Sequence, residues 1–317
     1  RPPVLSAARE NSAPIKVDMR LNYIVLLVFC GSLVCGYELV KVLEDAFPPL
    51  MMAAARAQLA AMVIFLFCLI ARQPLLPAFR RSAKLALIGV LGLGTLWAMV
   101  SLGERHVDPE LAMLLVCIVP ITTLVITALP PNPKHIWWPA WIGTAVASLG
   151  LVVVIGPARI ADEHSALYAV LMIGFGFASY ALANVLAEHM TKGLSPVAVG
   201  GVTMLYAAIL LWGLVFLLEA PIKMNPSAEA WLGLIALGVV GSALPGVLMF
   251  VLVKRAGAEF VSLYGYILPL LGIVVAWIAF GRAPEMMFLL GLPFTFAGVA
   301  TVQWARRHGF SANDLGK

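Results

Sequence analysis

Two charged side chains lie inside apolar stretches of this sequence, where an unpaired charge is energetically unfavourable. Glu38 lies in an apolar run that ends with LEDAFPP, and Arg56 lies a few residues beyond Pro49 in the next run. If both runs are helices, each charge is buried about 7–10 Å from the same end, at about 1.5 Å per residue. A charge within a membrane costs about 2.5–3.5 kcal/mol, so each residue needs a partner, a cavity or a neutral form.

Three roles remain open for Glu38. It can pair with Arg56, or extend toward Lys41 on the next helical turn, as a structural residue. It can face a central cavity and bind a cationic or amino group. It can also gain and lose a proton in a functional cycle, because desolvation favours the neutral carboxyl group. The sequence does not separate these roles.

Other polar and aromatic residues at the same depth form a second set of candidates. Tyr180 and Asn184 are four residues apart, so a helix places both on one face. An interior position would spare Asn184 an unpaired amide in lipid, and both helix–helix hydrogen bonding and substrate contact remain open for it. For the aromatic residues, packing is the alternative to substrate contact. The candidate substrate-binding or coupling residues are Glu38, Arg56, Tyr37, Trp97, Tyr180, Asn184 and Tyr264.

Catalytic and metal sites have little support in the sequence. The 5 histidines lie in loops or at helix ends, without a pair at metal-ligand spacing on one helix. The 4 cysteines fall in apolar runs, where they pack as small apolar residues. We therefore expect no catalytic residue, no metal site and no cofactor.

The composition of the chain indicates which secondary-structure elements hold these residues. Hydrophobic residues make up 62% and charged residues 12% of the 317 positions, against about 45–50% and 25% in globular domains. Apolar runs of about 20 residues, long enough to cross a hydrocarbon core of about 30 Å, recur along the chain. We predict an all-α membrane protein with ten transmembrane helices, at residues 21–43, 49–71, 83–102, 109–129, 136–155, 166–187, 196–218, 230–253, 260–280 and 286–303.

The basic residues gather on one side of this predicted bundle. If ten helices alternate, most lysines and arginines fall on the side of the two termini, and the acidic residues Glu44 and Asp45 fall on the other. The net charge of +5 then indicates topology, and we expect no nucleic-acid partner. By the positive-inside rule, both termini are expected in the cytoplasm of a multi-pass protein of the bacterial inner (plasma) membrane.

The chain also shows signs of an internal duplication. Aligning Pro49 with Pro196 brings the two halves into one register, and after a shift of about two residues Gly92 aligns with Gly241. Because each half has an odd number of helices, the second half must be inverted in the membrane. We predict two inverted five-helix repeats at residues 21–156 and 157–305, flanked by cytoplasmic tails at residues 1–20 and 306–317.

Small residues within the predicted spans suggest where helices bend. Glycine-rich runs at residues 89–94, 174–179 and 241–246 allow close helix approach and local bending. Pro120, Pro245 and Pro269 each remove a backbone hydrogen bond within a span. The glutamate of the first half has no counterpart, because Val185 aligns with Glu38.

Several stretches resemble a known family. CGS at residues 30–32 and PPLMMAAAR at residues 48–56 resemble the first-repeat signature of the drug/metabolite transporter superfamily, in its ten-helix EamA-like branch. The stretches RHVDPELAMLLVCIVP and RAGAEFVSLYGYILP resemble the fourth and ninth helices of that family. The family includes carriers of amino acids, drugs, sugar phosphates and nucleotide sugars, so the resemblance implies a carrier fold and no single substrate. Cys30 and Arg282 depart from the family pattern, which often has Trp and Glu there.

Together these observations predict a secondary-active transporter rather than an enzyme. We expect it to export small metabolites, such as amino acids or related amines, across the inner membrane by alternating access between the two repeats. The alternative is a broad-specificity exporter of drugs or cationic compounds. The expected partners are a small-molecule substrate and the lipid bilayer, while the oligomeric state and the coupling ion stay open.

Overall fold

The computed structural model describes residues 19–103, 115–129, 138–155, 164–219, 224–280 and 286–313. Within these ranges all regular elements are helical, and 7 helices are long and apolar enough to cross a membrane. Shorter apolar helices lie at Ile118–Ala128 and Leu289–Val302. The prediction of an all-helical membrane protein is therefore confirmed.

The elements follow one another in two similar series. The first series contains α1 (Met19–Leu43), α2 (Pro49–Ile70), α3 (Leu76–Phe79), α4 (Ser82–Gly89), the π-helical segment η1 (Val90–Gly94), α5 (Thr95–Gly103), the short 3-10 helix η2 (Leu115–Cys117), α7 (Ile118–Ala128) and α8 (Trp138–Ile155). The second contains α9 (His164–Met190), α10 (Pro196–Leu218), α11 (Ala228–Gly238), the π-helical segment η4 (Val239–Ala243), α12 (Leu244–Ala256), α13 (Ala258–Val261), α14 (Tyr264–Phe280) and α15 (Met286–Asn313).

Most predicted spans match a helix to within a few residues, and two differ. The span predicted at 260–280 is divided into α13 and α14. At the break, the Ser262 hydroxyl donates to the Glu259 carbonyl over 2.8 Å, and backbone bonds such as Leu263 N–H to the Phe260 carbonyl are of the tighter i−3 kind. The last helix continues through Asn313, well beyond the predicted end at residue 303. The beginnings of the spans predicted at 109 and 136 lie outside the described residues.

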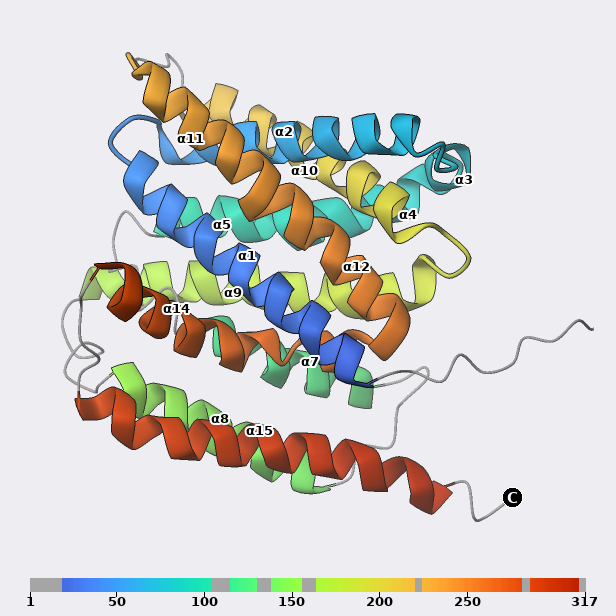
Figure 1. Ribbon diagram of the computed structural model, residues 1–317, viewed down its shortest axis with the longest axis vertical. Helices are drawn as coiled ribbons and strands as arrows, with labels where there is room; N and C mark the ends of the chain where they lie inside the picture. Colours follow the sequence, from blue (N-terminus) through green and yellow to red (C-terminus); the bar gives the residue numbers. More distant parts are fainter. Residues whose placement is uncertain are drawn as a thin grey trace, which may run out of the picture.

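The helices form a layered bundle (Figure 1). Helices α2, α10 and α11 pack at one edge of the view, and α8 and α15 lie side by side at the opposite edge. Between them, α1, α9, α12 and α14 surround a large apolar core that includes Phe29, Phe177, Phe250 and Tyr264. The core thus lies where elements of both series meet.

The two π-helical segments interrupt corresponding helices of the two series. Segment η1 packs against α9 and α10, whereas η4 packs against α1 and α2. At Gly92 in η1 the backbone leaves helical geometry, with φ −75° and ψ −112°. These segments fall on two of the three glycine-rich runs that predict local bending, at 89–94 and 241–246. The third run, at 174–179, lies in the continuous helix α9.

The two ends of the bundle differ in character. The α1–α2 and α9–α10 connections lie at opposite ends of the bundle (Figure 1). At the α9–α10 end, Arg81 donates to the carbonyls of Met190 and Lys192, and Arg255 donates to the Asn22 side chain over 2.8 Å. At the α1–α2 end, the Glu219 carboxylate accepts from the first free backbone N–H groups of α2, which stabilises that helix N-terminus.

Glycines allow the backbones of α8 and α15 to come into direct contact. A Cβ on Gly298 would lie 2.3 Å from the backbone nitrogen of Ala147 and 2.5 Å from the carbonyl oxygen of Gly143. The same close approach recurs about two turns away, where a Cβ on Gly150 would lie 2.9 Å from the Gly291 carbonyl oxygen. Backbone atoms cannot rotate aside as a long side chain can, so these positions require glycine.

We predict that Gly298→Ala lowers the thermal unfolding midpoint in detergent. The added methyl group overpacks the contact between α8 and α15, which lowers the free energy of unfolding by about 1–3 kcal/mol. Each kcal/mol lost lowers the unfolding midpoint by about 2–4 °C. Gly213→Ala is the matched control, because a Cβ on Gly213 in α10 meets nothing within 4 Å. Equal midpoints for the two variants would contradict the packing of α8 against α15.

Candidate functional site

A cavity of about 80 Å³ lies where helices of both series converge. A buried space of about 10–15 Å³ holds one water molecule, so this cavity has room for several waters or a small ligand. It extends from Pro49, at the beginning of α2, to residues in the middle of the bundle. The polar and aromatic lining residues are Phe29, Tyr37, Arg56, Trp97, Ser101, Phe177, Tyr180, Ser242 and Tyr264, and Met52, Met204 and Met249 complete much of the apolar wall.

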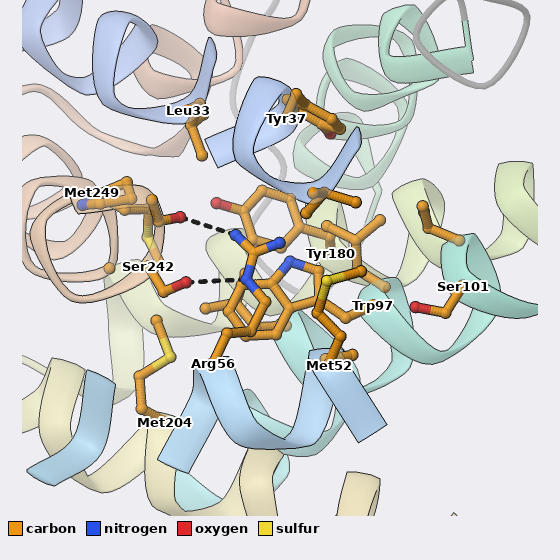
Figure 2. Close-up of a pocket in the computed structure, with 18 of the residues that line it drawn as sticks. Leu33, Tyr37, Met52, Arg56, Trp97, Ser101, Tyr180, Met204, Ser242 and Met249 are labelled. Atoms are coloured by element: carbon orange, nitrogen blue, oxygen red, sulfur yellow. Dashed lines mark hydrogen bonds between the residues drawn. The ribbon is translucent and has the colours of Figure 1, made fainter. Parts of the chain in front are cut away.

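Arg56 brings the positive charge to this cavity. Its guanidinium extends from α2 toward η4, where Nε donates to the Ser242 hydroxyl over 2.9 Å and Nη2 donates to the Gly241 carbonyl over 2.8 Å (Figure 2). The guanidinium carbon lies 4.3 Å from the centre of the Trp97 ring, a cation–π distance. Contacts with two acceptors and one aromatic face fix the orientation of the charged group.

The local sequence explains why the guanidinium can reach η4. A Cβ on Gly36 would lie 3.1 Å from both the Cα and the carbonyl oxygen of Gly241, so α1 and η4 approach through two glycines. In a π-helical segment the backbone hydrogen bonds shift, and carbonyl groups become available to other donors. The Ser242 hydroxyl also donates to the Leu237 carbonyl over 2.9 Å, which positions its oxygen to accept from Arg56.

Aromatic rings form much of the remaining wall. The rings of Phe29 and Tyr264 meet edge to face with centroids 5.5 Å apart, and those of Tyr180 and Tyr264 meet in the same way at 6.1 Å. The Trp97 ring lies against Arg56 (Figure 2), and Tyr180 lines the same cavity. No carboxylate appears among the described residues that line the cavity. The arrangement suits a small molecule with an anionic group and an apolar body.

A second, smaller cavity of about 10 Å³ lies beside η1. It shares Leu93, Tyr180 and Met249 with the large cavity. Asn184 and Thr203 contribute its polar groups, and the Thr203 hydroxyl donates to carbonyl groups of its own helix. The side chain of Asn184 is 2% exposed, which agrees with the interior position expected from the sequence.

The structure brings most of the sequence candidates together. Five of the seven, Tyr37, Arg56, Trp97, Tyr180 and Tyr264, line the large cavity. Asn184 lines the smaller cavity. Glu38 lies half-buried on α1 and contributes to neither cavity.

The sequence did not reveal which groups accept hydrogen bonds from Arg56. The hydrogen bonds of its guanidinium to Gly241 and Ser242 were not foreseen, although these residues begin the glycine-rich run at 241–246.

Among the described residues, no group of three or more His, Cys, Asp and Glu side chains could hold a metal ion. The described cavities therefore offer binding surfaces, through one cation, hydroxyl groups and aromatic rings.

Comparison with known proteins places the chain among transporters. It is 26% identical over 263 residues to the uncharacterized transporter YdfC of Bacillus subtilis, covering 80% of this chain and 82% of YdfC. It is 25% identical over 251 residues to the uncharacterized inner membrane transporter YedA of Escherichia coli, covering 79% of each chain. A probable terminal-alkyne amino-acid exporter of Streptantibioticus cattleyicolor is 26% identical over 239 residues, or 71% of this chain and 74% of the exporter.

A solved structure and a family model extend this comparison. One crystal structure, described without a function, superposes with a TM-score of 0.74 over 91% of this chain and 98% of its own, at 18% identity, so the fold is shared. The model of the EamA-like transporter family matches twice, at residues 22–156 and 167–304. These two matches follow the two series of helices. The chain belongs to the EamA-like transporter family.

Proposed function

We propose that this protein is a secondary-active carrier built from two inverted five-helix repeats. The correspondence of η1 with η4, their exchanged packing partners and the opposite orientation of the α1–α2 and α9–α10 connections all support the inversion. In such a carrier, two similar halves exchange conformations around a central site. Basic side chains at the α9–α10 end support a cytoplasmic location for that end.

The observation that carries the proposal is the position of Arg56 in the wall of the large cavity. A guanidinium attracts and orients a carboxylate through charge-assisted hydrogen bonds. Aromatic and methionine side chains around it offer apolar contacts. The best-supported substrates are therefore small carboxylates with an apolar body, amino acids first among them, and the direction proposed is export.

Relatives add support of a different kind. One relative is named a probable amino-acid exporter and another an inner membrane transporter, which agrees with export of small metabolites across a bacterial inner membrane. Export of related amines or cationic drugs is the second candidate. Its support is the set of tyrosine and tryptophan rings in the cavity, because aromatic faces attract cations.

Binding of three matched probes separates these candidates. L-phenylalanine, its deaminated acid 3-phenylpropanoate and its decarboxylated amine phenethylamine share one apolar body. We predict that the two carboxylates raise the thermal unfolding midpoint of the purified protein by several degrees at saturation, because a ligand that binds only the folded state stabilises it. The amine should raise it far less, since Arg56 repels a cation. Stabilisation by the amine alone would favour the cation exporter.

A mutant cycle tests what holds Arg56. We predict that Arg56→Ala lowers the free energy of unfolding by about 1–3 kcal/mol, because it leaves the Gly241 and Ser242 acceptors without their donor. In a Ser242→Ala background the loss should be smaller, with a coupling of about 0.5–3 kcal/mol. The matched cycle of Arg56→Ala with Glu38→Gln should show additive effects. A large coupling energy between Arg56 and Glu38 would instead favour a structural ion pair between these two residues.

A further inference from the structure

The small cavity beside η1 contains a buried amide whose hydrogen-bonding capacity the fold leaves incompletely used. No hydrogen bond of standard geometry joins Oδ1 or Nδ2 of Asn184 to another described residue. The Tyr180 hydroxyl, one turn earlier on α9, lies close enough for a loose hydrogen bond to one polar atom of this amide, and the other atom is left without a partner among the described residues. Buried polar groups almost always find partners, so an exception calls for a ligand or an ordered water in some state of the protein.

The position of this cavity repeats that of the Arg56 site in the other half. The register that aligns Pro49 with Pro196 places Asn184 on Tyr37 and Thr203 on Arg56. After the shift of about two residues described above, Gly92 of η1 corresponds to Gly241 of η4. Each cavity is thus bounded by a π-helical segment and by the same two positions of the facing helices.

The two corresponding cavities differ in volume. The cavity at Arg56 measures about 80 Å³, and the cavity at Asn184 measures about 10 Å³. In an inverted-repeat carrier, the halves differ in any one state and exchange conformations during transport. A narrow space in one half is then the closed form of the wide space in the other.

We propose that the Asn184 cavity is a second substrate subsite, closed in this structure and open in the opposite-facing state of the carrier. This inference rests on the proposed carrier function. In that state the cavity opens toward the α9–α10 end, and Asn184 contacts the polar end of the transported molecule.

The chemistry of the amide indicates which groups this subsite accepts. Asn184 offers two N–H donors and one acceptor, so a carboxylate can accept from Nδ2 and an amino group can donate to Oδ1. A monovalent cation would satisfy only the oxygen and leave the amide donors unpaired. The subsite therefore fits the carboxylate and amino groups of an amino acid. Since hydrogen bonds to an uncharged amide are weaker than those to a guanidinium, it holds the molecule less tightly than Arg56 does.

Sided labelling of introduced cysteines tests this proposal without knowledge of the substrate. The variants are Asn184→Cys and its register counterpart Tyr37→Cys, treated with a charged, membrane-impermeant methanethiosulfonate in vesicles of both orientations. The unsubstituted protein, with its own cysteines, gives the background. Thr203→Cys, in the same small cavity, replaces Asn184→Cys if that variant does not fold.

We expect Tyr37→Cys to react several-fold faster from the α1–α2 side and Asn184→Cys several-fold faster from the α9–α10 side. Labelling of Asn184→Cys from the α1–α2 side alone, or no labelling above background, would overturn the inference. The carrier proposal is judged separately, by stabilisation of the unsubstituted protein with L-phenylalanine or 3-phenylpropanoate. Stabilisation without labelling from the α9–α10 side would remove the second subsite and leave the carrier site at Arg56.

Discussion

The placement of one guanidinium group inside the helix bundle shapes the centre of this protein. A charge within an apolar bundle requires fixed acceptors, and the backbone of a regular α-helix has no carbonyl to spare. The π-helical segment η4 provides one at Gly241, and Ser242 adds a hydroxyl beside it. The glycine pair Gly36 and Gly241 then allows α1 to approach closely enough to enclose the contact. Helix bending, helix packing and charge placement are therefore parts of one arrangement.

That arrangement links the two series of helices at the cavity. Arg56 belongs to α2, and its acceptors belong to η4, so the same guanidinium that lines the cavity also joins the halves. A bound carboxylate would compete with the Gly241 and Ser242 oxygens for the guanidinium donors. Substrate binding and the contact between the halves would then be linked, as a carrier with alternating access requires.

Much of the fold could be predicted from the sequence, because apolar length and charge position are local properties. Helix α10 matches its predicted span, and the half-buried position of Arg56 and the buried position of Asn184 follow from their place within apolar runs. The contacts of Arg56 were beyond such reasoning. The rotation of a helix about its axis depends on neighbours far away in sequence, and this rotation directs Arg56 toward Gly241 while Glu38 lies outside both cavities. The break between α13 and α14, where the Ser262 hydroxyl donates to the Glu259 carbonyl, was likewise not predictable from apolar length.

We propose that a molecule bound at Arg56 is carried across the membrane by exchange between two conformations. Counterflow in proteoliposomes tests it most directly. Vesicles loaded with unlabelled L-phenylalanine are diluted into a trace of the labelled amino acid, with Arg56→Ala as the control protein. The account predicts transient accumulation of label above its equilibrium level with the unsubstituted protein, and none with the variant. Equilibration without an overshoot, or an overshoot that survives Arg56→Ala, would contradict it.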